Sequence, residues 1–457
     1  MYTRVYSGGN MNQLKIGYIT TVSGRWPREL PIQRNAEYGA WLRENAGDAQ
    51  IIGFDHVIDS PQRIQEAVST FRAEGVGLVI MVYGAFTGDD VCTTIAEELH
   101  LPLILWAPRE PDVHGGRLLS NALVAMTMNN ASLQRLGHYP QTIYGGLESD
   151  AAKKKILNLI RAYSAIRKLR GSTLGLFGYR PTAFYNSAFD EGLIRKTFGI
   201  SIEETDLKVV FDRMLEVDVE ELKKDLEFIL GGFKLGDDFV PEYRMNHSRL
   251  YLTLKQLMQE QNYAYGVIKC WPEMGNLKAV PCAVLGRLAD EGYNIACEGD
   301  VDVALSMAAQ NALTGKPNFI TDMIDINEEQ NYLTFWHCGN AAPSLHHKDC
   351  CVSLCDHPLY NKGSAFRAVL KEGPVTISRF CNVDGKYKLF LVGGTAIKAD
   401  MYTPGCMVNV VTKTPVRDIV DGIIAEAVPH HYSVVWEDVA DDMETIAKIL
   451  GIEVVRF

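Results

Sequence analysis

Strand-like and helix-like runs alternate through much of this chain, and this alternation constrains the fold more than any other feature. KIGYITT at 15–21, VGLVIMVYG at 76–84 and LPLILWA at 101–107 are short apolar runs of the kind that form buried strands. Amphipathic stretches, for example at 61–74, separate such runs. Strands that alternate with helices are typical of parallel α/β sheets. We therefore expect an α/β fold over this part of the chain.

A long amphipathic run at 151–171 marks the end of this first unit, because its apolar residues recur at helical spacing and it stops at a glycine. The alternation starts again at TLGLFGYRP (173–181). It continues with a strand expected over LKVVFDRM (207–214) and a helix expected over 301–314. A second α/β unit is therefore expected after the first.

The pattern changes at about residue 323, where short strand-like runs replace the helical periodicity. YLTFWHC (332–338) and KYKLFLVGG (386–394) are examples, and one helix is expected near 437–449. We predict an α/β fold class, with two Rossmann-like α/β domains followed by a β-rich C-terminal domain. The predicted domains are an N-terminal domain over 1–171, a central domain over 172–322 and a C-terminal domain over 323–457.

The charge balance argues against two classes of partner. The formal net charge is −11 and no Lys/Arg block is present, so nucleic acid and anionic membranes are not expected as partners. No uncharged apolar stretch approaches ~18 residues, so no transmembrane helix is expected. The N-terminus has no apolar signal core, which favours a cytoplasmic location.

The ten cysteines are expected to be reduced, because this is a long chain with no apolar signal core at its N-terminus. Cys350, Cys351 and Cys355, with histidines nearby, suggest a structural zinc site. Paired CxxC motifs are missing and adjacent cysteines fit tetrahedral zinc badly. Buried or surface thiols are therefore the favoured interpretation.

Two carboxylates at the ends of strand-like runs suggest a cation site. Glu298 is the last but one residue of YNIACEG, Asp322 ends PNFITD, and one helix-like run lies between them. A right-handed crossover would make the two strands parallel neighbours, with both carboxylates at one sheet edge. The alternative is ordinary helix capping, because Glu298, Asp300 and Asp302 lie just before or at the start of that helix.

Histidines strengthen the interpretation as a metal site. His337 follows an apolar run, and His430 and His431 lie in PHHYSVVWED. Two carboxylates with one or two imidazoles form a mixed oxygen and nitrogen site, which suits Mn²⁺, Mg²⁺ or Co²⁺. A structural or exposed role remains the alternative for each histidine.

Several segments resemble the L-fucose isomerase and L-arabinose isomerase superfamily. CEGD at 297–300 and ALTGKPNFITD at 312–322 are similar to the segments that carry the family's acidic metal ligands. FWHCGN at 335–340 and PHHYSVVWEDV at 429–439 resemble histidine-bearing segments of arabinose isomerases. The resemblance implies a divalent metal, usually Mn²⁺, with Mg²⁺ or Co²⁺ as alternatives. The implied metal ligands are Glu298, Asp322, His431 and His337, with His431 favoured over His430.

The same resemblance implies an aldose–ketose isomerase that works through a cis-enediol intermediate. Glu298 and Asp322 would carry the acid/base catalysis, and His337 would bind either the metal or the sugar. A homo-hexamer is implied, with active sites at subunit interfaces. Arg25 and Trp26 in the SGRWPRELP loop, and Trp271 in IKCWPEM, would contact the sugar substrate. The alternatives are a solvated loop for the arginine and a core position for Trp271.

Three functions are compatible with these residues. The first is isomerisation of a free monosaccharide. The second is isomerisation of an anionic aldose, such as the sulfonated sugar sulfoquinovose or a phosphorylated sugar, selected by Arg25, Arg28 and Lys269. The third is a non-catalytic sugar-binding protein, because tandem α/β domains also occur in proteins that only bind sugars.

Overall fold

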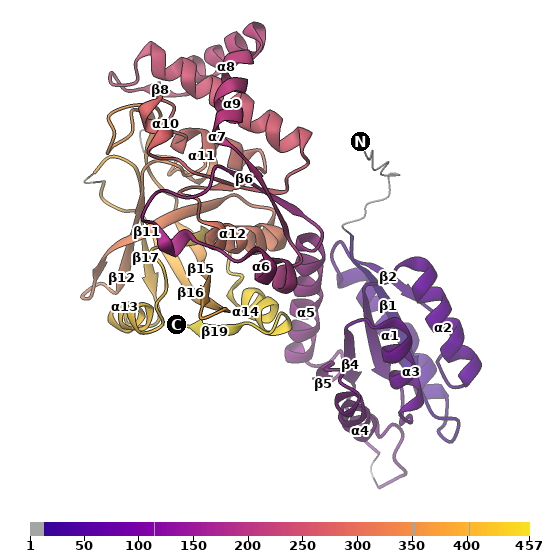
Figure 1. The fold of residues 1–457 in the computed structure, drawn as a ribbon. Helices are drawn as coiled ribbons and strands as arrows, with labels where there is room; N and C mark the ends of the chain where they lie inside the picture. The colour runs from indigo at the N-terminus through magenta and orange to yellow at the C-terminus, as the bar shows by residue number, and fades with distance from the viewer. Residues whose placement is uncertain (1–12, 114, 350–351, 402) are drawn as a thin grey trace. The chain divides into compact units, whose positions relative to one another are not determined.

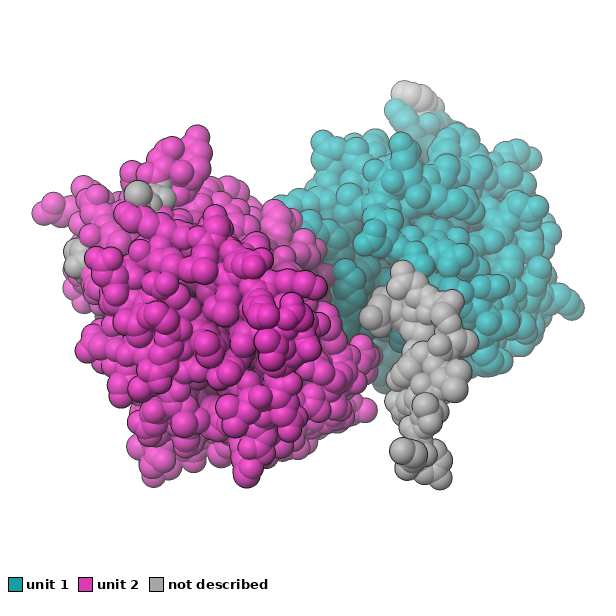
Figure 2. Space-filling model, turned by 90° about the horizontal axis from the view of Figure 1, so that it is seen from above, with its two compact units in different colours: residues 1–168 teal, residues 169–457 magenta. Residues whose placement is uncertain are grey.

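The structure is a computed structural model that describes residues 13–113, 115–349, 352–401 and 403–457. The chain divides into two compact units, residues 1–168 and residues 169–457, which Figure 2 colours separately. Cys350 and Cys351, which suggested a zinc site, lie outside the described residues.

The first unit is a parallel sheet with strand order β2-β1-β3-β4-β5 (Figure 1). Every residue of β3, with the sequence LVIMVY, is buried, as expected for a parallel strand covered on both faces. The strands are β1 (Lys15–Thr21), β2 (Gln50–Gly53), β3 (Leu78–Tyr83), β4 (Leu103–Ala107) and β5 (Gln141–Tyr144). The helices are α1 (Glu29–Asn45), α2 (Pro61–Glu74), α3 (Asp90–Leu99), α4 (Ala122–Arg135) and α5 (Asp150–Leu169).

The second unit begins with another parallel sheet, of order β10-β9-β6-β7. Its strands are β6 (Thr173–Phe177), β7 (Ser201–Thr205), β9 (Tyr265–Ile268) and β10 (Ile295–Ala296). The helical elements of this part are η1 (Tyr185–Ser187), α6 (Glu191–Phe198), α7 (Leu207–Glu216), α8 (Val219–Gly232), α9 (Pro241–Glu260), α10 (Glu273–Asn276), α11 (Cys282–Asp290) and α12 (Val301–Thr314).

The strand predicted over 207–214 is wrong, because this segment is helix α7. Asp206 caps the helix by accepting a hydrogen bond from the backbone N–H of Lys208, and Leu207, Val210 and Met214 form its buried face. Those apolar residues are spaced three and four apart, which fits a helix and not a strand.

The rest of the second unit is a β-rich layer in which β16 pairs with both β15 and β17. This double pairing closes the antiparallel ring β16-β15-β18-β11-β12-β17 into a barrel. The strands are β8 (Lys234–Leu235), β11 (Asn318–Asn327), β12 (Tyr332–His337), β13 (Ser353–Cys355), β14 (Ala365–Val369), β15 (Gly373–Val383), β16 (Lys386–Ile397), β17 (Cys406–Thr412), β18 (His431–Val435) and β19 (Glu453–Arg456). The helical elements are η2 (Pro343–Leu345), α13 (Val416–Ala425) and α14 (Ala440–Ile449).

Helix α12 joins the parallel sheet to the barrel, since it contacts β9 and β10 on one side and β15 and β18 on the other. Its polar side chains are tied to barrel strands. Gln310 donates to the carbonyls of Thr376 and Ser433, and the Ser306 hydroxyl accepts the backbone N–H of Phe380. These bonds fix the middle and the C-terminal half of α12 against the barrel.

The predicted fold class is confirmed, with two parallel α/β sheets followed by an antiparallel barrel. The division into domains at residues 171 and 322 stays a prediction. Among the described residues, no helix combines the length and the apolar character that a membrane crossing needs.

Candidate metal centre

A tight turn between β10 and α12 positions Glu298. Glu298 itself has a positive φ of 56°, and Gly299 follows at 64°. A Cβ atom on Gly299 would lie 2.1 Å from the carbonyl oxygen of Tyr179, so only glycine fits this approach. Asp300 then caps α12 by accepting the backbone N–H of Val303. The turn therefore aims Glu298 away from the helix instead of capping it.

Asp322 and His431 reach the same place through the barrel. They are direct cross-strand partners in the antiparallel pair β11–β18. The prediction that the strands carrying Glu298 and Asp322 are parallel neighbours is wrong, because β10 belongs to the parallel sheet and β11 to the barrel. The two carboxylates approach each other across two sheets, and α12 connects them.

Both carboxylates face one imidazole nitrogen. His431 Nε2 lies 3.5 Å from Glu298 Oε2 and 3.8 Å from Asp322 Oδ1. The neighbouring His430 Nε2 also lies 3.5 Å from Glu298 Oε2, although the His430 side chain is 41% exposed and that of His431 only 1%. The structure thus brings Glu298, Asp322 and His431 together, with His430 at the rim.

The second nitrogen of His431 is held by a buried ion pair. His431 Nδ1–H donates to Asp300 Oδ2 at 2.9 Å, and Arg379 Nη1 donates to the same oxygen at 2.6 Å. Asp300 and Arg379 are both fully buried. An imidazole whose Nδ1–H is bound to a carboxylate presents Nε2 as its free nitrogen, the usual arrangement of a metal-binding histidine. Sequence reasoning assigned Asp300 to helix capping only and missed Arg379.

The charges in this cluster shift its pKa values in two directions. Burial alone would raise the pKa of Asp300, but the Arg379 charge and the His431 hydrogen bond lower it well below its usual range. Burial alone would lower the pKa of His431, but Asp300, Asp322 and Glu298 together raise it. Burial opposes ionisation of Glu298 as well, and the nearby imidazoles lower its pKa overall. The surroundings therefore favour the ionised forms of Glu298 and Asp300 and the protonated form of His431.

His337 lies beside this group. Its ring centroid is 5.6 Å from that of His431, and its Nε2 is 3.5 Å from Cys297 Sγ. Its Nδ1 is buried without a hydrogen-bond partner among the described residues, and so is Asp322 Oδ1. Cys297, His337 and His431 form a group whose ligand atoms all lie within 4.8 Å of one another, and Glu298, His430 and His431 form a second such group.

The donor set fits a divalent cation. Two carboxylate oxygens and an imidazole nitrogen lone pair face one another, and an orphaned acceptor lies on Asp322. Negative and lone-pair atoms in such proximity repel unless a proton or a metal ion lies between them. Mixed carboxylate and imidazole donors suit Mn²⁺, Co²⁺ or Mg²⁺.

Trp271 forms one wall of this group. Its indole N–H donates to Glu298 Oε1 at 3.2 Å, and its ring packs edge-on against Phe184 with centroids 5.0 Å apart. The side chain is half-buried. Trp271 therefore positions a carboxylate, a contact that the sequence did not reveal.

The cations expected to select an anionic sugar differ in their pairing. Arg28 forms an ion pair with Asp59, and Lys269 forms one with Glu273. Arg25 is exposed. Arg25, Arg28 and Trp26 belong to the first unit, where Trp26 packs against Phe86 with ring centroids 6.4 Å apart.

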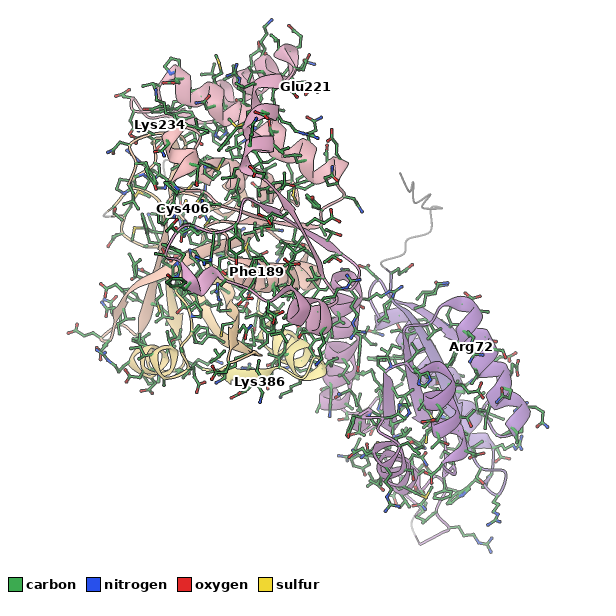
Figure 3. The ribbon with its side chains drawn as sticks, in the orientation of Figure 1. Arg72, Phe189, Glu221, Lys234, Lys386 and Cys406 are labelled. Atoms are coloured by element: carbon green, nitrogen blue, oxygen red, sulfur yellow. The ribbon has the colours of Figure 1, made fainter. Side chains whose placement is uncertain are left out.

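Arg180 is a cation that sequence reasoning overlooked. Its Cα and Cβ lie against Gly299, directly after Glu298. Its guanidinium carbon is 5.4 Å from the ring centroids of both Tyr179 and Tyr185, and within the described chain no carboxylate pairs with it. Tyr179 packs in turn on Phe189, which Figure 3 labels. The only signal was its place directly after strand β6, at the carboxyl end of a parallel sheet.

Sequence comparison finds relatives over most of the chain. A sulfoquinovose isomerase of Alkalicoccus urumqiensis is 28% identical over 374 residues, which cover 81% of this chain and 84% of the relative. A sulfoquinovose isomerase of Priestia megaterium is 25% identical over 418 residues, covering 90% and 92%. An L-arabinose isomerase of Nocardioides sp. is 23% identical over 205 residues, covering 42% and 40%. No family model matches the chain. The chain is thus a distant homologue of sulfoquinovose isomerases and, over a shorter stretch, of an L-arabinose isomerase.

Proposed function

We propose that this protein is a metal-dependent aldose–ketose isomerase whose substrate is a sulfonated aldose, sulfoquinovose. One observation carries the assignment to this reaction class: Glu298 and Asp322 converge on the free nitrogen of a buried histidine. The choice of a sulfonated over a neutral sugar rests on the relatives, since the sulfoquinovose isomerases match the chain over a larger share of its length than the arabinose isomerase does.

Glu298, Asp322 and His431 would hold the cation, with His337 as a fourth candidate ligand. A divalent ion bound there supplies a Lewis acid for the sugar carbonyl and for the charge that develops on the neighbouring oxygen. Asp300 keeps the proton on Nδ1 of His431 and thereby keeps Nε2 free. The Trp271 N–H orients Glu298.

The reaction moves a proton between C1 and C2 of the sugar. A carboxylate at this position can take the proton from one carbon and return it to the other, an acid/base role worth roughly 10²–10⁴-fold in rate. Glu298 and Asp322 are the two candidates, and either can act as the base. The half-buried Trp271 ring offers an apolar surface for the face of the sugar.

The assembly is also a proposal. We expect the homo-hexamer that the family resemblance implies, with Arg25 and Trp26 of one subunit reaching the site of another. Light scattering on the purified protein measures the mass directly. A monomer that turns over sugar at full rate contradicts this part of the proposal and leaves the chemistry in place.

The function is tested by incubating the purified protein with Mn²⁺ and single aldoses, and by detecting ketose formation by NMR. Sulfoquinovose is expected to react, and glucose, L-fucose and L-arabinose serve as neutral comparisons. Faster turnover of a neutral sugar would overturn the substrate assignment. Binding of sugars without turnover, in the presence of any of Mn²⁺, Mg²⁺ or Co²⁺, would favour a non-catalytic sugar-binding protein.

A further inference from the structure

A thiol lies within reach of the same histidines. Cys297 directly precedes Glu298, and its Sγ is 3.5 Å from His337 Nε2. The ligand atoms of Cys297, His337 and His431 all lie within 4.8 Å of one another, and all three residues are at least 97% buried. The thiol of Cys270 lies close to that of Cys297. The isomerase chemistry uses neither sulfur atom.

We propose that Cys297, His337 and His431 form a second, softer donor set that binds a thiophilic cation such as Zn²⁺ or Cd²⁺ in place of the catalytic ion. One sulfur and two imidazole nitrogens are donors that zinc prefers, with an open fourth position for water. The oxygen-rich set of Glu298 and Asp322 suits Mn²⁺ or Mg²⁺ instead. As the sulfur–metal bond forms, the thiol proton leaves to solvent.

The two donor sets exclude each other because they share His431, and also His337, the fourth candidate ligand of the oxygen-rich set. The Nδ1 of His431 is bound to Asp300, so Nε2 is the nitrogen left for a metal. A soft cation bound to His431 Nε2 and the Cys297 sulfur therefore takes His431 away from the oxygen-rich set of Glu298 and Asp322. Zinc also binds nitrogen and sulfur donors more tightly than manganese does in general. We expect Zn²⁺ to inhibit the isomerase in competition with Mn²⁺, an inhibition that rests on the proposed function.

Cadmium tests the binding step without any activity measurement. Cd²⁺ is added to the metal-free, full-length protein, and the thiolate-to-cadmium absorption in the ultraviolet is followed. The wild-type protein is expected to develop this band with one Cd²⁺ per chain, and Cys297→Ser to lack it. Cys381→Ser is the matched control, because Cys381 is equally buried but lies on β15 with its Sγ directed at the Lys388 carbonyl. Cys406 on β17, labelled in Figure 3, offers a second control of the same kind.

Zinc inhibition tests the functional consequence. At fixed Mn²⁺, Cys297→Ser is expected to need at least about tenfold more Zn²⁺ for half inhibition, since even an outer-shell change costs about that much metal affinity. Cys381→Ser should behave like the wild type. Equal zinc sensitivity of the wild type and Cys297→Ser would overturn the competition.

Two further outcomes separate the proposals. The proposed Cys297 metal site is wrong if the wild type shows no thiolate-to-cadmium absorption, or if Cys297→Ser shows this absorption undiminished. Either result holds even if the isomerase is active. A band that depends on Cys297 in a protein that converts no sugar keeps the soft site and contradicts the proposed function. If Cys297→Ser fails to fold by circular dichroism, cadmium NMR of the wild type decides, because thiolate coordination shifts the cadmium resonance away from the range of nitrogen and oxygen ligands.

Discussion

The imidazole of His431 donates from Nδ1 to Asp300 at 2.9 Å, and neither side chain is more than 1% exposed. Asp300 thus fixes the ring that carries the free nitrogen of the centre. It also neutralises Arg379, whose Nη1 lies 2.6 Å away. One carboxylate therefore serves both the stability of the second unit and the orientation of a candidate ligand.

Asp300→Asn is expected to lose both roles. Breaking a buried ion pair costs about 3–5 kcal/mol, and the unfolding free energy should fall by that order because Arg379 is left unpaired. Asp300→Asn with Arg379→Met should recover stability but not turnover, because His431 still lacks its anionic acceptor. Denaturant unfolding and kcat measure the two effects. Recovery of kcat in the double variant would show that Asp300 does not position His431.

Glu298→Gln is expected to lower kcat by about 10²–10⁴-fold in the presence of saturating Mn²⁺, because it removes a residue that is both a candidate metal ligand and a candidate base. Isothermal titration with Mn²⁺ should show weaker binding as well. The exposed Glu329, which lies in a turn between β11 and β12, provides the matched control Glu329→Gln, which should behave as the wild type. Turnover of Glu298→Gln within a few-fold of the wild type would contradict the assignment.

Comparing Gly299→Ala with Gly315→Ala separates the cost of a steric clash from the cost of backbone strain. Both Gly299 and Gly315 have φ near 65°, but a Cβ on Gly299 would meet the Tyr179 carbonyl at 2.1 Å and one on Gly315 would meet nothing within 4 Å. Gly315→Ala should therefore cost about 1 kcal/mol from conformation alone, and Gly299→Ala clearly more. The measurement is the unfolding free energy of both variants, together with their Mn²⁺ affinities. Only Gly299→Ala should weaken metal binding, because Glu298 precedes it.

A buried histidine outside the centre predicts acid sensitivity. His247 Nε2 accepts from Arg287 at 2.9 Å, so its Nδ1–H must donate to Ser364 Oγ at 2.8 Å, and the ring is neutral. Burial first, and the Arg287 charge second, hold the pKa of His247 well below its ordinary 6.5. The unfolded chain then binds a proton that the folded chain does not, as the pH falls below about 6.5.

The unfolding free energy should therefore decrease between pH 7 and pH 5, with a slope of up to about 1.4 kcal/mol per pH unit from this residue. His247→Gln should reduce that slope. His346 and His357, whose pKa values burial lowers to about 4, contribute in the same direction and keep some slope in the variant. An identical slope in His247→Gln and the wild type would contradict the prediction.

Arg180 is expected to contribute to the binding of an anionic sugar. Arg180→Gln should raise KM for sulfoquinovose by about tenfold or more, because a charge-assisted hydrogen bond is worth about 1.5–3 kcal/mol. KM for any neutral aldose that the enzyme accepts should change little. Lys208→Gln, which removes a cation already paired with Asp212, is the control. A parallel rise in KM for neutral and sulfonated sugars would instead indicate a structural role.

Local sequence signals predicted the elements best where both ends carry caps. The helices expected at 61–74 and 301–314 have those bounds in the structure, because Ser60 and Asp300 accept N-terminal N–H groups and Gly75 and Gly315 adopt left-handed conformations. The strand predicted over 207–214 was wrong because the apolar composition of a short segment does not by itself distinguish a helix from a strand.

The residues of the centre could be predicted from the sequence, but the way in which the fold brings them together could not. Carboxylates and histidines next to apolar runs suggested the candidate residues. Their meeting depends on the closure of the barrel and on the register that places Asp322 opposite His431, both of which are long-range pairings. The partner Arg379 lies in the middle of a strand, where nothing local distinguishes it from a surface residue.

The centre is assembled from segments as distant as Asp300 and His431, which are 131 positions apart. An ion bound between β10 and β18 would act as a crosslink that closes a very long loop, and such links constrain the unfolded chain strongly in principle. The ion would also connect the helix-covered sheet to the barrel. Chelation should therefore lower the melting temperature and expose the C-terminal strands to proteases, which makes metal content a determinant of how long the folded protein survives.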